Sequence, residues 1–358
     1  MITNNKFSWC VGDYQRKYKK SILGLFKKEY PESVLWKDEF FEWQHFKNPA
    51  GESIIKLAIN TKEEVVGFYC VLLQDYFINR KLFHGSISLS TLVREDYRGM
   101  GIFTILAQEC YKECFKRGVK FTLGFPNQNS YPGFIRKLGF LNLGELPLLI
   151  KPYRLSNLVA EKLNSGVMGM MVRPIDFLIN LFNKDSCCGL SEDMTDSFHD
   201  LFWRKARKKY QIVANRDARF IDWRTKWPER KYKYFCVKKN NKIEGYIILG
   251  LLGTKNVKNG LIVDFVVNDS SDAQSIGNDL LKETNHYWKM ENVDQAGCLI
   301  SKNSFEFKLL RKNGYFICPN FLKPQPMVAV FKWHGNDCPL EVSDLQKWYI
   351  TTIDYDVA

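Results

Sequence analysis

The stretch that decides the fold runs from Thr91 to Phe140 and reads TLVREDYRGMGIFTILAQECYKECFKRGVKFTLGFPNQNSYPGFIRKLGF. Its β-rich start leads to Gly99 and Gly101, after which apolar residues recur at helical spacing, so both glycines lie at a strand-to-helix junction. Glycine lets the backbone approach a ligand closely, and the free N–H groups of the first helical turn attract an anion such as a diphosphate. Taken alone, the glycine pair is explained equally well by a tight turn.

The residues after this junction lengthen the pattern. The helix is followed by a second strand over residues 120–125, a polar turn and a short helix that is stopped by Gly139. This order resembles the core of the GNAT superfamily of acyl-CoA-dependent N-acyltransferases, whose signature is Arg or Gln, two residues, Gly, one residue, then Gly or Ala. Arg98 and Gly101 match the signature, whereas Phe103 stands at its third small position.

The second half of the chain repeats landmarks of the first half at offsets of 175 to 180 residues. The matched landmarks are Trp43 with Trp223, Gly67 with Gly245, and Gly139 with Gly314. We therefore expect an α/β (α+β) fold of two tandem GNAT-like domains, each with a mixed, mostly antiparallel central sheet flanked by helices. In the second half, residues 268–273 replace the glycine loop, and their two carboxylates would repel a diphosphate.

These landmarks predict four parts of the chain. Residues 1–150 form an N-terminal GNAT domain with the acyl-CoA site, and residues 151–190 form a helical connector. Residues 191–334 form a degenerate GNAT-like domain for acceptor binding or scaffolding, and residues 335–358 form a tail that docks on the body. The apolar connector has a second interpretation, as a helix that binds a membrane surface or a partner.

The composition indicates a globular protein with a basic surface. The chain has 358 residues, 52 Lys and Arg against 39 Asp and Glu, and a formal net charge of +13. Such a field attracts CoA phosphates, a nucleotide diphosphate, nucleic acid or an anionic membrane, although solvated lysine faces explain it as well. The scattered cysteines and histidines form no zinc pattern, so we expect no metal. With no signal-peptide pattern and no long apolar segment, we expect a cytoplasmic monomer or homodimer without integral membrane contact.

The family resemblance implies where acyl-CoA binds, either as acetyl-CoA or as 3-hydroxybutanoyl-CoA. The loop and the first helical turn would hold the pyrophosphate, while the strand before the loop and two asparagines after the next strand would hold the pantetheine arm. These cofactor-binding residues are Leu92, Val93, Arg98, Gly99, Met100, Gly101, Ile102, Phe103, Thr104, Asn127 and Asn129. Each asparagine is explained equally well as a helix N-cap.

The sequence does not identify a single general acid or general base. Many GNAT enzymes protonate the leaving thiolate with a tyrosine four residues before the closing glycine, and that position is Ile135 here. The catalytic candidates are Tyr131 with its neighbour Ser130 as substitute acids, and His45, His84, Ser90 or Glu95 as the base. An unperturbed imidazole titrates near neutrality, which favours His45. Direct attack by a neutral amine, with water relaying the proton, is the alternative.

The tandem arrangement also resembles N-acyltransferases of bacterial surface-polysaccharide (O-antigen) pathways, which modify nucleotide-linked amino sugars such as dTDP-linked 3-amino-3,6-dideoxyhexoses. This resemblance implies that the chain binds a nucleotide sugar as its acceptor and does not bind nucleic acid. Trp43, Trp223 and Arg224 are the acceptor-binding candidates, although core packing explains either tryptophan equally well. Two other functions are a Fem-type peptide or aminoacyl transferase, disfavoured by the intact Arg98 to Gly101 loop, and a non-catalytic acyl-CoA sensor.

Overall fold

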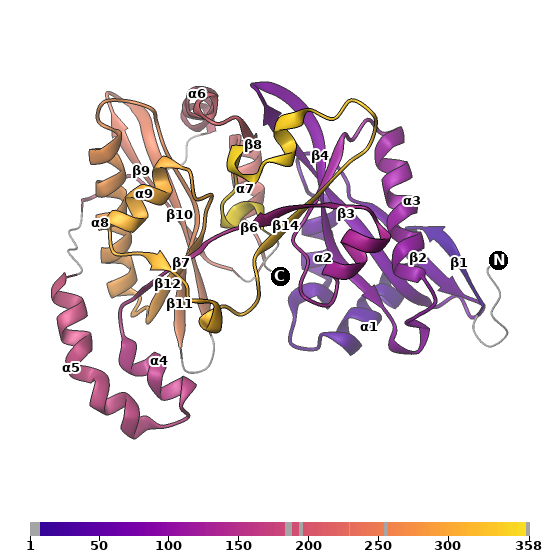
Figure 1. The fold of residues 1–358 in the computed structure, drawn as a ribbon, viewed down its shortest axis with the longest axis horizontal. Helices are drawn as coiled ribbons and strands as arrows, with labels where there is room; N and C mark the ends of the chain where they lie inside the picture. The colour runs from indigo at the N-terminus through magenta and orange to yellow at the C-terminus, as the bar shows by residue number, and fades with distance from the viewer. Residues whose placement is uncertain (1–7, 183–187, 193–195, 229, 254–256, 356–358) are drawn as a thin grey trace. The chain divides into compact units, whose positions relative to one another are not determined.

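The computed structural model describes residues 8–182, 188–192, 196–228, 230–253 and 257–355 (Figure 1). The chain forms two compact units. The first unit comprises Met1–Glu145, Gln325–Leu345 and Asp356–Ala358, and the second comprises Leu146–Pro324 and Gln346–Tyr355.

The first unit is built on a sheet whose strands follow the order β1-β2-β3-β4-β5-β14-β6. Neighbouring strands are antiparallel, except that β4 and β5 are parallel. The strands are β1 (Trp9–Asp13), β2 (Ile54–Asn60), β3 (Val65–Ile78), β4 (Lys81–Val93), β5 (Phe121–Gly124), β6 (Leu141–Glu145) and β14 (Val328–Trp333). β3 is a nearly continuous apolar run because both of its faces are covered.

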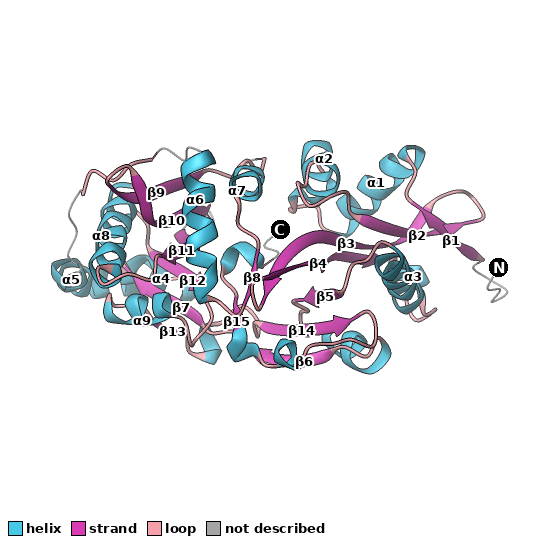
Figure 2. Ribbon diagram, turned by 90° about the horizontal axis from the view of Figure 1, so that it is seen from above, coloured by secondary structure: helices cyan, strands magenta, loops and turns pink. Residues whose placement is uncertain are grey.

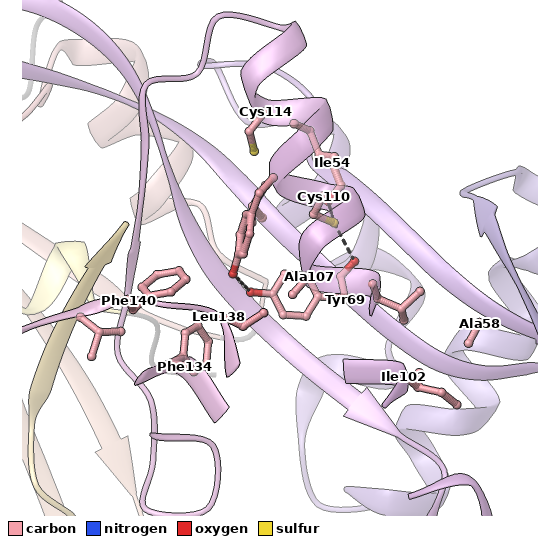
Figure 3. Close-up of a cluster of buried hydrophobic side chains, with 14 of the residues drawn as sticks. Ile54, Ala58, Tyr69, Ile102, Ala107, Cys110, Cys114, Phe134, Leu138 and Phe140 are labelled. Carbon is pink, nitrogen blue, oxygen red and sulfur yellow. Dashed lines mark hydrogen bonds between the residues drawn. The ribbon is translucent and has the colours of Figure 1, made fainter. Parts of the chain in front are cut away.

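Helices cover both faces of this sheet (Figure 2). They are α1 (Lys19–Glu29), α2 (Asp38–Phe46), α3 (Ile102–Lys116) and the short π-helical turn η4 (Gly133–Lys137). Phe68 and Tyr69 are consecutive on β3 and therefore point to opposite faces. The ring of Phe68 lies 5.1 Å from that of Phe26 in α1, and the ring of Tyr69 lies 6.0 Å from that of Tyr111 in α3. The α3 face carries a buried hydrophobic cluster (Figure 3).

The second unit repeats this plan. Its sheet has the order β9-β10-β11-β12-β7-β13, and only the β11 and β12 pair is parallel. The strands are β7 (Leu148–Pro152), β9 (Tyr232–Lys239), β10 (Lys242–Gly253), β11 (Lys258–Val267), β12 (Gln295–Leu299) and β13 (Phe316–Ile317), with a separate parallel pair of β8 (Ile212–Ala214) and β15 (Trp348–Tyr349). The helices are α4 (Leu155–Lys162), α5 (Gly166–Phe182), α6 (Asp196–Ala206), α7 (Ala218–Thr225), α8 (Ala273–Met290) and α9 (Phe305–Lys312). The matching strand directions confirm two tandem α/β domains of the same plan with mostly antiparallel sheets.

Each unit takes one strand from the other half of the sequence. β14 comes after the second unit in sequence yet pairs with β5 and β6, and β7 follows β6 directly yet pairs with β12 and β13. The units therefore differ from the predicted bounds of 1–150 and 191–334. Pairing between strands far apart in sequence sets the real division, and a linear division of the chain cannot represent it.

A lysine on each exchanged strand caps a short helix. Lys332 of β14 donates through Nζ to the carbonyl of Leu138 at 2.7 Å, and Lys151 of β7 donates to the carbonyl of Asn313 at 2.9 Å. Both carbonyls stand immediately before the glycine that closes the short helix, so they are the orphan acceptors of a helix end. Burial lowers the pKa of both lysines, to about 8 for Lys151. This shared contact supports the internal duplication.

The predicted connector over residues 151–190 includes residues 183–187, which lie outside the described residues. Its described part belongs to the second unit, where α4 and α5 form a helical hairpin (Figure 1). The carboxylate of Asp176 accepts a hydrogen bond from the N–H of Ser156 at 3.2 Å, which joins the two helices. Several apolar side chains of α5 are exposed, namely Val167, Met168, Met170, Met171, Ile175, Phe177 and Leu178. Among the described residues, no helix combines the length and the apolar character needed to span a bilayer.

We expect residues 1–145, expressed alone, to aggregate, because β5 and β6 then expose unpaired edges to solvent. Joining residues 325–345 to this fragment through a flexible linker restores β14, and this joined chain should show a cooperative thermal transition by circular dichroism. A joined chain that carries Val330→Asp, a charge at a fully buried position of β14, serves as the control. A cooperative transition in residues 1–145 alone would contradict this expectation.

Candidate functional site

The glycine loop forms an open cradle at the N-terminus of α3. Gly99 and Gly101 have φ values of 81° and 77°, which lie in the left-handed region that favours glycine. A Cβ at Gly99 would meet no atom within 4 Å, so this part of the loop is open. The first backbone bond of the helix runs from the N–H of Ile105 to the carbonyl of Gly101 at 3.1 Å. The N–H groups of the preceding turn therefore point out of the helix end, where an anion binds.

Arg98 lies beside this cradle. Its guanidinium donates to the carboxylate of Glu29 at 2.8 Å and to the carbonyl of Val93 at 3.2 Å, and its side chain is more than half exposed. Glu29 ends α1, so the contact ties that helix to the loop. A guanidinium held next to a helix N-terminus adds a second donor group for phosphate oxygens.

The parallel strands β4 and β5 part immediately before the loop. They pair from Gly85 with Phe121 to Ser88 with Gly124, and β5 then ends while β4 continues to Val93. Ser90 has a φ of 44° and lies where the register with β3 shifts, which marks a β-bulge. The predicted pantetheine residues Leu92 and Val93 follow this bulge, on the part of β4 beyond its pairing with β5. A gap between two strands that ends at an anion cradle suits an extended ligand with a diphosphate.

Phe103, which departs from the family signature, is accommodated by a neighbouring glycine. Its ring packs 5.7 Å from that of Phe134 and 5.8 Å from that of Tyr69. A Cβ at Gly133 would come within 2.8 Å of the Phe103 ring, so η4 approaches α3 only because that position has no side chain. The large residue in α3 and the missing side chain in η4 are thus complementary.

The two predicted histidines are not brought to the gap. His45 is 2% exposed, lies between the rings of Phe41 and Phe68, and shares a 3.0 Å hydrogen bond with Ser53 through Nδ1. Burial lowers the pKa of His45 to about 3, so the ring is neutral near pH 7 and shielded from solvent. His84 lies four residues before the end of the β4 and β5 pairing and contacts Asp75 at 2.7 Å. Neither placement favours a role as the general base.

Two further catalytic candidates, Ser90 and Tyr131, lie in different surroundings. Ser90 lies at the bulge, and its Oγ is buried and has no hydrogen-bond partner within the described residues. Tyr131 packs against the hydrophobic cluster. Asn127 caps a turn, since its Oδ1 accepts from the N–H groups of Asn129 and Ser130 at 3.0 Å each. Asn127 therefore caps a turn ahead of η4, whose own N-cap residue is Pro132, and its contact with pantetheine stays a prediction.

The predicted acceptor residues are buried. Trp43 is 5% exposed and packs against Phe40 in α2, and Trp223 is 7% exposed and packs against Phe220 in α7. The guanidinium of Arg224 donates at 3.4 Å to backbone carbonyls of the C-terminal segment. These side chains hold each unit together, and this burial favours the core-packing interpretation of both tryptophans.

In the second unit, the corresponding gap is filled by the protein itself. β11 and β12 pair only from Asn259 to Leu261, and β11 continues to Val267. The C-terminal segment binds both strands beyond that point. Its hydrogen bonds join Tyr349 to Phe265 and Thr351 to Asp264 on β11, and Thr352 to Leu299 at the end of β12. The tail therefore occupies the position that an extended ligand would need in this unit.

Carboxylates near the gap of the second unit also disfavour the binding of a diphosphate there. The buried guanidinium of Arg216 pairs with Asp264 and Asp354, which anchors the tail. At the start of α8, Asp272 takes the N-cap position and pairs with Lys239. A carboxylate thus stands where the first unit offers bare amides, as the sequence indicates. Within the described residues, no group of His, Cys, Asp or Glu side chains could hold a metal ion.

Ser88 was not among the predicted residues, although it lies at the last β4 and β5 pair and is hydrogen-bonded to Tyr69 at 2.8 Å. A signal for it exists in the sequence, because serines recur at every second position, at 86, 88 and 90. That period places Ser86 and Ser88 on one face of a strand. The sequence does not show which face of this strand meets the ligand, because that depends on where β4 and β5 separate.

The buried His45 predicts a pH dependence of stability. Its folded pKa of about 3 lies below the ordinary 6.5, so its stabilising contribution is present above pH 6.5 and is lost as the pH falls toward 3. When the pH falls from 7 to 5, the unfolding free energy of the unmodified protein should therefore drop by about 2 kcal/mol more than that of His45→Gln, which has no group to protonate at this position. Urea unfolding at both pH values measures this difference, and equal losses would show that His45 is protonated in the folded state.

Comparisons with known proteins agree with this geometry. Residues 19–140 match the acetyltransferase (GNAT) family model, and no curated protein matches the sequence. Among solved structures, a GCN5-related N-acetyltransferase from Anabaena variabilis has a TM-score of 0.65 at 11% identity, covering 92% of this chain and 73% of that chain. N-myristoyltransferase from Saccharomyces cerevisiae, with bound myristoyl-CoA, has a TM-score of 0.63 at 12% identity, covering 93% and 83%. A probable N-acyltransferase from Enterococcus faecalis has a TM-score of 0.58 at 12% identity, covering 91% and 72%.

At these identities the solved structures show the fold, and the family match over residues 19–140 is independent support for acyl transfer in that segment. The matched segment contains the glycine loop, α3 and the β4 and β5 gap described above. Residues 19–140 are therefore similar to a GNAT acetyltransferase domain, and this match supports acyl-CoA-dependent N-acyltransferase activity at the glycine loop.

Proposed function

We propose that the chain transfers an acetyl or short hydroxyacyl group from acyl-CoA to the amine of a nucleotide-linked amino sugar, in the cytoplasm, during surface-polysaccharide synthesis. The observation that carries the acyl-CoA part is the parting of β4 and β5 at Ser88, which opens directly onto the glycine loop. The acceptor part is supported by the tandem arrangement and by the net charge of +13, which attracts a doubly charged diphosphate.

The site residues then have separate tasks. The amides of the first α3 turn and Arg98 bind the pyrophosphate, and Glu29 orients Arg98 through its 2.8 Å ion pair. The backbone of Leu92 and Val93 pairs with the pantetheine arm and donates to the thioester carbonyl. This contact stabilises the oxyanion that forms when the amine attacks.

Within the part of the chain that the structure describes, the first unit carries this site and the second unit does not. The tail fills the second gap, and Asp272 stands at the N-terminus of α8, so we assign the second unit to acceptor binding or scaffolding. A second candidate function, a non-catalytic acyl-CoA-binding protein, is favoured by one observation. Ile135 occupies the position at which many members of the family carry their acidic tyrosine, and it packs against the hydrophobic cluster.

A free-thiol assay separates these functions. Acetyl-CoA and 3-hydroxybutanoyl-CoA are each offered with a panel of dTDP- and UDP-linked amino sugars, and released CoA is measured. We expect release with a dTDP-linked 3-amino-3,6-dideoxyhexose. Tight CoA binding without release for any amino sugar would instead favour the binding protein.

We expect Gly101→Val to weaken CoA binding by about tenfold or more, since a side chain at this φ strains the loop and covers its amides. Gly118→Val is the matched control, because Gly118 has a φ of 73° and open space around it but lies at the other end of α3. Isothermal titration with CoA measures both variants. Equal loss in the two would show that fold damage, and not the cradle, explains the effect.

A further inference from the structure

Three hydroxyl groups form a chain beneath the gap. Tyr69 on β3 is hydrogen-bonded to Tyr111 on α3 and, at 2.8 Å, to Ser88 on β4. Tyr69 is fully buried and Tyr111 is 6% exposed, whereas Ser88 is only partly buried. The chain therefore begins inside the hydrophobic cluster and ends at the last pair of β4 and β5.

Burial determines which atom donates in each bond. Within the described residues, Tyr69 is the hydrogen-bond partner of the Tyr111 hydroxyl, whose ring stacks on His334. If Tyr69 donated to Tyr111, the hydrogen of Tyr111 would be buried without an acceptor, which is costly. Tyr111 therefore donates to Tyr69, and Tyr69 donates to Ser88. Burial raises the pKa of both tyrosines well above 10, so both keep their protons.

This order leaves the hydrogen of Ser88 free to donate outward. Ser88 pairs with Gly124, and beyond this pair the two strands part. Its hydroxyl lies on the same sheet face as Tyr69, the face covered by α3, and the Tyr69 ring contacts Phe103 of that helix. The hydrophobic cluster on this face also includes Ile135, the position that lacks the family's tyrosine.

We propose that Ser88 donates a hydrogen bond to the sulfur of CoA as the thiolate leaves, with Tyr69 and Tyr111 as positioning residues. This inference rests on the proposed acyl-CoA function. In the reaction, the C–N bond forms, the C–S bond breaks and its electron pair goes to sulfur. The proton lost by the amine reaches sulfur through water, and Ser88 keeps its own proton while stabilising the negative charge.

The thiol pKa of bound CoA tests the proposal without any acceptor. The thiolate is followed by its ultraviolet absorbance as the pH rises, as a difference from the complex with desulfo-CoA, which cancels the protein's own thiols. In Ser88→Ala the bound thiol should titrate about one pH unit higher than in the unmodified protein, because a hydrogen bond to the charged sulfur is lost. Ser88→Thr keeps a hydroxyl and should restore the lower value.

Ser86→Ala is the matched control. Ser86 lies two residues earlier on the same face of β4, but its hydroxyl is engaged by Thr122 at 2.7 Å and by the carbonyl of Phe121 at 3.1 Å. Its removal should leave the thiol pKa unchanged. Tyr111→Phe should raise the thiol pKa by less than Ser88→Ala does, since the Ser88 hydroxyl remains but is no longer held in a fixed orientation.

The outcomes are distinguishable. If the unmodified protein does not bind CoA, the proposed function fails. If CoA binds and its thiol pKa is the same in the unmodified protein and in Ser88→Ala, the role of Ser88 is overturned while the proposed function stands. With an accepted amino sugar, Ser88→Ala should lower kcat by about tenfold and leave KM for acyl-CoA unchanged.

Discussion

The site depends on where the pairing of two parallel strands stops. Four residue pairs hold β4 to β5, and the last of them joins Ser88 to Gly124. Beyond it, the bulge at Ser90 turns β4 toward the glycine loop, while β5 ends. A Cβ at Gly124 would press on Val330 and Phe134 at 3.2 and 3.5 Å, so the end of β5 lies directly against β14 and η4. Close packing on one side of β5 and a bulge in β4 thus open the gap between them.

The two units show the same scaffold with and without a ligand gap. The order of the central strands, the parallel pair at the gap and the lysine on the exchanged strand are common to both. The second unit differs because its own C-terminal segment binds along β11 and the end of β12, and because Arg216 neutralises two buried carboxylates there. Removing one partner from such a group leaves a buried charge unpaired, so the tail is part of the fold of this unit.

The local features of the site could be predicted from the sequence, and the long-range ones could not. The glycine loop is recognisable because its signal, a turn between strand and helix periodicity, lies within a few residues. His45, Trp43 and Trp223 suit a ligand site by residue type alone, but neighbouring aromatic rings enclose them. Ser88 could not be chosen by residue type, because nothing in its local sequence distinguishes it from the neighbouring serines. Its hydrogen-bonded chain to Tyr69 and Tyr111 is formed by residues of another strand and a helix.

The exchanged strands have a consequence for biosynthesis. While the chain emerges from the ribosome, β5 and β6 lack their pairing partner β14, which is synthesised almost two hundred residues later. The nascent first unit therefore exposes open sheet edges throughout synthesis of the second, and such edges attract chaperones and other chains. Any premature stop before residue 328 removes β14, so cellular quality control would meet an incomplete catalytic unit even though its glycine loop is intact.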